Sequence, residues 1–169
     1  LIIRWGTHRL RDETPDYRPN QNRFVLDPKA VFYAFFAKHM MGDASLMSMV
    51  AKVNYYTLGA DTQDAPGNQW RTANTWPPFP IKATNYYMHS DGTLSPEPPT
   101  GAEDAKTFTF DPNDPLPTLG GANMTIKSGP FDQRPVYTER TDYLRFTTAP
   151  LEAPMEITGR VKVRLSVSS

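Results

Sequence analysis

The 169-residue chain contains no cysteine, which excludes disulfide bridges and thiolate metal ligands and leaves the redox compartment and localisation unknown. No apolar stretch approaches the roughly 20 residues that a membrane-spanning helix needs. The 18 basic and 18 acidic residues cancel, and neither sign forms a long run. Because nucleic acids and anionic membranes are recognised by basic patches, the sequence predicts neither as a partner.

Complete catalytic signatures are also missing from the sequence. No serine lies in a Gly-x-Ser-x-Gly nucleophile elbow, and no glycine-rich phosphate loop is present. The three histidines, His8, His39 and His89, are far apart and lack metal-ligand spacing, so no metal site and no cofactor is expected. Taken as a closed unit, the chain therefore lacks a catalytic constellation.

Turn residues and aromatic residues are plentiful instead. The chain has 17 prolines, 10 glycines and 12% aromatic residues, which favours a turn-rich β protein over a helical one. The 38% hydrophobic content suffices for a packed core. Turn residues are densest in 110–121, where Asp-Pro and Gly-Gly pairs predict a shaped loop.

Short runs of β-branched and aromatic residues, separated by proline or glycine, predict strands. They cover residues 1–5, 53–58, 81–89, 106–110, 136–138, 143–148 and 155–168. In the last run, apolar residues alternate with charged residues and serine, which is typical of a strand with one face on a core. Together these runs predict a mainly β fold, with a β-sandwich beginning near residue 51.

One helix is predicted, between a capping Asp27 and Gly42, with Pro28 in its first turn. Apolar side chains recur at spacings of three and four and form a wide face that must pack on a larger body. Residues 9–23 read as a surface loop, and 44–50 fit either a short helix or a loop at a domain boundary. Because strands at both ends need neighbours, we expect these residues to be a segment of a longer protein.

Each histidine has two interpretations. His8 follows the first strand, in a loop where a general base can reach a pocket, although a lone histidine there also fits a structural role. His39 lies near the end of the helix, where its charge complements the helix dipole. His89 ends a strand just before residues 91–92, Asp-Gly, which predict a tight turn, and Asp91 either tunes the pKa of His89 or makes a local turn hydrogen bond.

Three further patterns have a functional and a structural interpretation. Four aromatic residues can form a platform for a sugar or peptide, or pack in a core: Trp70, Trp76, Tyr86 and Tyr87. The mixed charges of 132–134 and 139–142 favour a buried or interface ion-pair network. Residues 123–125, Asn-Met-Thr, match the N-glycosylation sequon, a pattern short enough to arise by chance.

Several stretches taken together resemble the cocaine esterase and X-Pro dipeptidyl-peptidase family of serine hydrolases. They are FYAFFAKHMMG at 32–42, VNYYTLG at 53–59, QWR at 69–71, WPP at 76–78, DPNDPLPTLGG at 111–121, GPFDQRP at 129–135, ERTDYLRFTTAPL at 139–151 and EITGRVKVRLSVSS at 156–169. Their joint order and spacing are specific, although no single stretch would be.

The resemblance implies an α/β-hydrolase body, a helical cap and a C-terminal jelly-roll sandwich of the galactose-binding type. Residues 1–46 would be the end of the catalytic domain, and 47–169 the first part of an incomplete jelly roll. The family's catalytic histidine usually follows Gly-Pro-Trp-x, and here residues 4–8 read Arg-Trp-Gly-Thr-His. The resemblance therefore implies His8 as the triad histidine, with the nucleophilic serine and the aspartate upstream of this sequence.

The implied activity is cleavage of ester or amide bonds in a small molecule or peptide. The implied partners are that substrate and the remainder of the hydrolase body, with a homo-oligomer also possible, and the segment alone is expected to be inactive. Two alternatives stay open from the residues: a carbohydrate- or ligand-binding sandwich, and a purely structural or interface domain.

Overall fold

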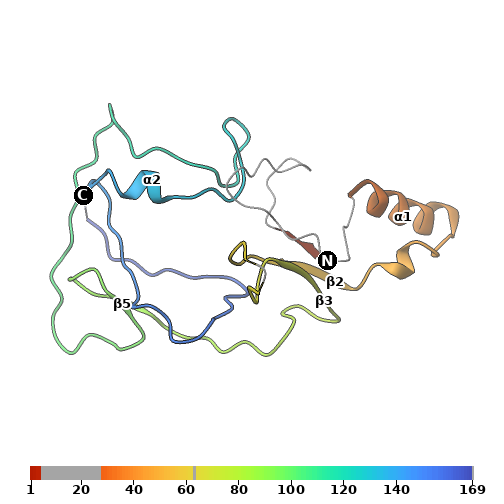
Figure 1. Ribbon diagram of the computed structural model, residues 1–169, viewed down its shortest axis with the longest axis horizontal. Helices are drawn as coiled ribbons and strands as arrows, with labels where there is room; N and C mark the ends of the chain where they lie inside the picture. Colours follow the sequence, from red (N-terminus) through yellow and green to blue (C-terminus); the bar gives the residue numbers. More distant parts are fainter. Residues whose placement is uncertain (5–27, 63, 169) are drawn as a thin grey trace.

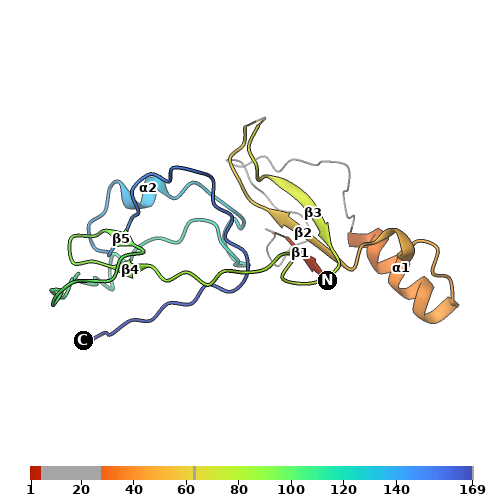
Figure 2. The same ribbon diagram turned by 90° about the horizontal axis from the view of Figure 1, so that it is seen from below.

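The computed structural model describes residues 1–4, 28–62 and 64–168 (Figure 1). Its elements are β1 (Ile2–Ile3), α1 (Pro28–Met41), η1 (Met47–Met49), β2 (Val53–Thr57), β3 (Gln69–Ala73), β4 (Tyr87–Met88), β5 (Leu94–Ser95) and α2 (Arg134–Tyr137). Helix α1 lies at one end, the sheet β1-β2-β3 in the middle, and β4, β5 and α2 at the other end (Figures 1 and 2). In the part of the chain described, no helix has the length and apolar character needed to cross a bilayer.

Strand β2 is the centre of the first sheet. It pairs in parallel with β1, with Ile3 beside Tyr55, and antiparallel with β3, with Tyr56 beside Trp70. Residues 53–56 of β2 are all buried, because the strand has a neighbour on each edge and aromatic rings on its faces. The strands expected at 1–5 and 53–58 are thus confirmed in their described parts, whereas β3 falls in a stretch whose sequence showed no regular period.

Two aromatic pairs cover β2. The Tyr55 ring meets Trp76 edge-on with centroids 5.6 Å apart, and the Tyr56 ring meets Trp70 in the same way at 5.5 Å. Burial of an aromatic side chain contributes about 2 kcal/mol to folding, so this cluster is the main core of the described residues.

The connection between β2 and β3 depends on a close approach of two glycines. A Cβ added at Gly67 would lie 2.5 Å from the carbonyl oxygen of Leu58, and one added at Gly59 would lie 2.7 Å from the Cα of Gly67. The next residue, Asn68, is buried in the left-handed region at φ 57°, and its side-chain oxygen accepts a hydrogen bond from the Tyr56 hydroxyl. The backbones can meet here only where side chains are missing.

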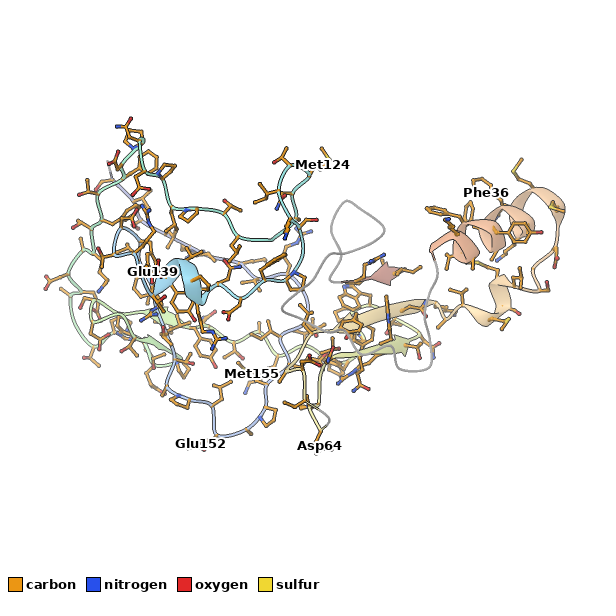
Figure 3. The ribbon with its side chains drawn as sticks, turned by 45° about the horizontal axis from the view of Figure 1, so that its top comes forward. Phe36, Asp64, Met124, Glu139, Glu152 and Met155 are labelled. Atoms are coloured by element: carbon orange, nitrogen blue, oxygen red, sulfur yellow. The ribbon has the colours of Figure 1, made fainter. Side chains whose placement is uncertain are left out.

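Helix α1 begins at Pro28 and is followed by Gly42 at φ 74°, as the sequence predicts, while the capping role of Asp27 lies outside the described residues. Only Ala34 and Ala37 are buried. The large side chains around the helix are exposed, with Phe36 at 53% and Met40 at 77% (Figure 3). A helix that is apolar on every side is normally buried, so α1 presents an uncovered surface.

The second sheet is the hairpin β4–β5, in which Tyr87 lies opposite Ser95. The predicted turn at residues 91–92 is confirmed, because the Gly92 amide donates to the His89 carbonyl at 2.9 Å and Gly92 has φ 92°. A single bridge ties Thr93 to Thr147. The loop expected at 110–121 is also irregular in the structure.

Several strand predictions are wrong for this structure. The run 81–89 is a strand only at Tyr87–Met88, 143–148 forms one bridge, and 106–110 and 155–168 form no strand. The alternating residues from Val161 to Val167 are 62–86% exposed. A strand needs a hydrogen-bonding neighbour, and none of the described segments pairs with these runs, so propensity alone does not produce a ladder. The two small sheets do not close into a sandwich.

The strand predicted at 136–138 is also wrong, because residues 134–137 form the short helix α2. A carboxylate oxygen of Asp132 accepts a hydrogen bond from the Arg134 amide at 2.9 Å, and the fixed φ of Pro135 suits a first helical turn. Thr138 donates its hydroxyl to the Arg134 carbonyl at 2.7 Å and closes the turn. These local hydrogen bonds override the β propensity of Val136 and Thr138.

We expect Gly67→Ala to destabilise the protein that carries this chain by about 1–3 kcal/mol, because the added methyl group would overlap the Leu58 carbonyl. Urea unfolding followed by tryptophan fluorescence measures the change. Gly101→Ala is the matched control, since nothing lies within 4 Å of its added Cβ. Equal midpoints for the two variants would contradict the close approach.

Candidate functional site

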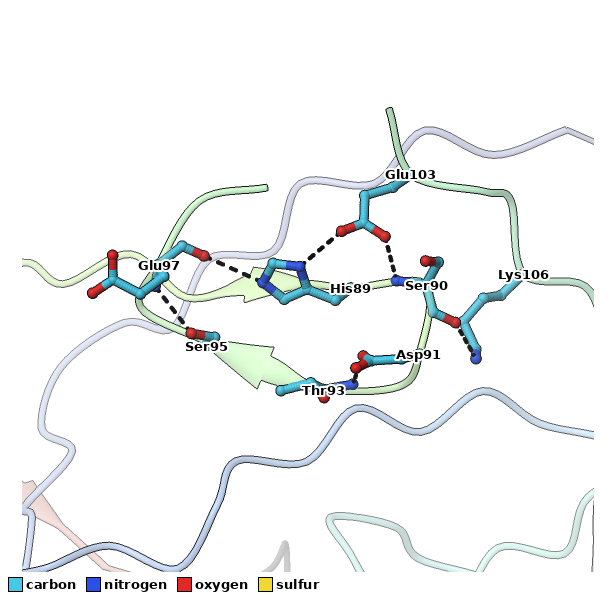
Figure 4. Close-up of polar contacts among 8 residues, drawn as sticks. All are labelled: His89, Ser90, Asp91, Thr93, Ser95, Glu97, Glu103 and Lys106. Atoms are coloured by element: carbon cyan, nitrogen blue, oxygen red, sulfur yellow. Dashed lines mark hydrogen bonds and ion pairs between the residues drawn. The ribbon is translucent and has the colours of Figure 1, made fainter. Parts of the chain in front are cut away.

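The first candidate from the sequence, His8, lies outside the described residues, so its catalytic role stays a prediction. The described residues bring another histidine into a polar cluster. His89 follows β4, and the loop 96–106 returns to place Glu103 beside it (Figure 4). This cluster and the hollow next to it form the candidate site of the described residues.

Both ring nitrogens of His89 face oxygen atoms. Nδ1 lies 2.8 Å from Oε1 of Glu103, and Nε2 lies 3.2 Å from the carbonyl oxygen of Glu97 (Figure 4). The other oxygen of Glu103, Oε2, accepts a hydrogen bond from the Ser90 amide at 2.7 Å. Lys106 donates to the Ser90 carbonyl at 2.8 Å. The loop therefore contacts both the amide and the carbonyl of Ser90.

The predicted alternatives for Asp91 are also resolved. Asp91 Oδ1 accepts a hydrogen bond from the Thr93 amide at 2.7 Å, which confirms the local turn hydrogen bond. That bond is the main reason the pKa of Asp91 is lowered. The direct acidic partner of His89 is Glu103 and not its sequence neighbour.

Electrostatics favour the charged forms of both partners. The hydrogen bond to Glu103 raises the pKa of His89 above its usual 6.5 and outweighs the opposing effect of desolvation. Hydrogen bonds from Ser90 and then from His89 lower the pKa of Glu103 to about 2. The two side chains are 19% and 31% exposed, so solvent screens the pair only in part.

The cluster is not a hydrolytic triad. A carboxylate beside a histidine Nδ1 has the geometry of the orienting half of a triad, but the other nitrogen must then face a nucleophile. Here Nε2 faces the Glu97 carbonyl, which has no proton to give. The described arrangement therefore has a structural function rather than a nucleophilic one.

Next to the cluster is an open hollow of about 400 Å³, lined by Asp91, Gly92, Lys106, Arg140, Thr141, Tyr143, Leu144, Arg145 and Thr147. Its cations are largely compensated. Arg140 contacts Asp142 at 2.5 Å and Asp114 at 3.0 Å, and these hydrogen bonds raise its pKa. With two carboxylates on Arg140 and Asp91 in the wall, the hollow carries no strong attraction for an anion.

Both predicted charge groups contain ion pairs, but they do not form one buried network, since the side chains of Arg134 and Asp132 are 72% and 33% exposed. Asp132 pairs with Arg134, and Asp142 pairs with Arg140, which also reaches Asp114 across 26 positions of sequence. Arg145 lies over the Tyr137 ring at 5.4 Å from its centroid. The partners Glu103 and Asp114 had no signal in the sequence, because each is brought in by a loop without periodicity.

The other candidates have structural roles. Trp70 and Trp76 pack on Tyr56 and Tyr55 and do not form a shared platform, and Tyr86 and Tyr87 lie apart from them in or beside β4. The side-chain amide of Asn123, in the sequon, donates to the Gly120 carbonyl at 2.6 Å. His39 lies against Phe35, with ring centroids 4.5 Å apart. Among the residues that the structure describes, no three metal-binding side chains come together.

Comparison with known protein families identifies the class of the chain. Residues 51–169 match the family described as the X-Pro dipeptidyl-peptidase C-terminal non-catalytic domain, and the chain belongs to this family. The family resemblance seen in the sequence is thereby confirmed. The matching region is thus the non-catalytic domain of such proteins.

The individual relatives are named as esterases. The chain is 36% identical over 147 residues to the cocaine esterase of Rhodococcus sp. (strain MB1 Bresler). The aligned region covers 80% of this chain and 24% of that protein. Putative serine esterases of Mycobacterium bovis and Mycobacterium tuberculosis are 27% identical over 139 residues, which covers 80% of the chain and 20% of each relative. The chain thus spans about a quarter or less of the length of these relatives.

The geometry of His89 predicts that its imidazole titrates above pH 6.5, because the charged form is hydrogen-bonded to Glu103. NMR of ¹³C-labelled histidine measures the pKa. We expect Glu103→Gln to lower the His89 pKa toward its usual value. Glu97→Gln is the matched control, because Glu97 offers His89 only its backbone carbonyl. A wild-type value at or below 6.5 would contradict the described contact.

Proposed function

We propose that this chain is part of a serine hydrolase that cleaves ester or amide bonds in a small molecule or peptide, with His8 as its triad histidine. The observation that carries the proposal is the 36% identity to a cocaine esterase over 80% of the chain. The two mycobacterial relatives are named putative serine esterases, so an ester is the substrate class that we favour.

The proposed mechanism uses His8 as the proton carrier. A serine elsewhere in the protein attacks the carbonyl carbon, and His8 takes the serine proton and then gives it to the leaving group. An aspartate, also elsewhere, holds the imidazole in the correct tautomer. No cofactor takes part in this scheme.

The proposed domain division places residues 1–46 in the catalytic body and 47–169 in the non-catalytic domain. The parallel pairing of β1 with β2 supports a firm connection between the two, because one strand comes from each side of the division. The amino group of Leu1 also donates to the Lys52 carbonyl at 2.8 Å. The remainder of the hydrolase body is the proposed partner of the exposed aromatic face of α1.

A jelly-roll sandwich is the proposed fold of the non-catalytic domain. Its support is the strict alternation in 161–168 together with the exposure of Val163 and Val167 at 69% and 86%, which leaves one apolar face to be covered. The carbohydrate-binding alternative gains no support from the described tryptophans, which pack on tyrosines of β2.

We expect His8→Ala to reduce ester turnover by the full-length protein by about 10³-fold or more, because the serine then has no general base. Hydrolysis of an aryl ester and labelling by a fluorophosphonate measure the loss. His39→Gln is the control, since His39 contacts Phe35 on α1 and should leave both readouts unchanged. Full labelling and turnover in the His8 variant would refute its assignment.

The sandwich proposal predicts different outcomes for neighbouring positions. Val163→Asp should destabilise the full-length protein by about 3 kcal/mol or more, because it places a charge on the covered face. Lys162→Asp lies on the opposite face and should change stability by about 0.5 kcal/mol or less. Thermal unfolding measures both, and equal effects would count against a strand in this segment.

A further inference from the structure

We propose that His89 is a pH-sensitive latch: its imidazolium fastens the loop 96–106 to the β4–β5 hairpin at both Glu97 and Glu103, and its neutral form gives up one of these two attachments and loosens the loop. The latch consists of His89, the Glu97 carbonyl, Glu103 and Ser90 (Figure 4). It is independent of the proposed hydrolase activity. The geometry of the ring carries the inference.

A neutral imidazole cannot satisfy this environment. It has one N–H donor and one acceptor, whereas both atoms that face the His89 ring are acceptors, a carboxylate oxygen and a carbonyl oxygen. Only the doubly protonated ring can donate to both. Loss of the proton therefore removes one of the two attachments and leaves two lone pairs facing each other.

The released attachments are specific to the loop. Glu97 and Glu103 lie near its two ends, 8 and 14 residues after His89, so the ring joins both ends of the loop to the hairpin. The remaining hydrogen bonds of the loop are those of Ser90 to Glu103 and Lys106 and that of the Glu97 amide to Oγ of Ser95 at 3.1 Å. The residues 98–102 between the two glutamates are exposed, so burial adds little to these polar contacts.

The acidic groups near the latch act in the same direction. On the loop Glu103 gives the largest contribution to the raised pKa of His89, and on the hairpin Asp91 gives a smaller one. Among the cations, Lys106 donates to the Ser90 carbonyl, and Arg140 and Arg145 line the hollow, where Asp142 and Asp114 compensate Arg140. Glu103 is therefore the group that chiefly sets the titration of the ring.

The pH range follows from the two partners. The pKa of His89 is raised in the folded state, so its contribution is complete below about 6.5 and is lost as the pH rises through the raised value. Glu103, with a pKa of about 2, stays ionised throughout that range and contributes fully above about 4.5. The latch is thus closed in weakly acidic solution and loosens toward basic pH.

Hydrogen–deuterium exchange of the full-length protein tests the latch, with the amides of Ser90 and Glu97, which donate to Glu103 and to Oγ of Ser95, as reporters. After correction for intrinsic exchange, we expect opening to be about threefold or more greater at about pH 8.5 than at about pH 5.5. The Ser90 amide is informative because its acceptor, Glu103, is ionised at both pH values. If the carboxylate held the loop without His89, protection would be the same at both.

Two variants separate the latch from a general effect of pH. His89→Gln has no titratable ring, so the loop should exchange at the fast rate at both pH values. Glu97→Gln keeps the carbonyl contact and should behave as the wild type. Exchange that does not change with pH in the wild type, or a His89→Gln loop as protected as the wild type at about pH 5.5, would overturn the proposal.

Discussion

The ladder of β2 is the constraint on which the described structure depends. This strand is the only element here with a hydrogen-bonding neighbour on both edges among the described residues, β1 in parallel and β3 antiparallel. Parallel pairing requires a long connection, and here 49 residues lie between the end of β1 and the start of β2. The contact therefore joins distant parts of the sequence. The aromatic rings of Tyr55 and Tyr56 then find Trp76 and Trp70 on the faces of β2, and the core follows from the pairing.

Away from β2 the chain is held by polar contacts more than by packing. Arg71 in β3 reaches Glu156 at 2.7 Å across 85 positions, Arg140 joins two aspartates, and His89 joins two glutamates. Partly exposed ion pairs contribute little stability, although they fix which segments lie together. The part of the chain outside the β1-β2-β3 sheet therefore has a defined arrangement with little buried apolar surface. Regions of this kind open at low energetic cost. A latch on a loop is physically reasonable in this setting.

The sequence predicted features that depend on local chemistry. Helix α1, its glycine terminator, the turn at Gly92 and strand β2 are all in the structure, because each follows from a few adjacent residues. Features that depend on distant partners were not predictable. Strand β3 has no alternation, yet it forms because β2 offers an edge, and Glu103 reaches His89 through a loop without a pattern. In α2, by contrast, the misleading feature was the β propensity of Val136, which the Asp132 hydrogen bonds overcome.

The same distinction explains the segment that ends in Val167. Alternation specifies which side chains share a face, but a strand exists only where another backbone supplies its hydrogen bonds. Residues 161–167 have the alternation and lack the neighbour in the described chain, so their apolar side chains are 62–86% exposed. The large side chains of α1 are likewise exposed, because the two alanines that the helix buries account for little of its apolar surface. Exposed apolar area of this size is found where another surface binds. The proposed hydrolase body would cover the apolar surface of α1, and the closed sandwich would cover the apolar face of residues 161–167. Both proposals therefore answer the same physical requirement.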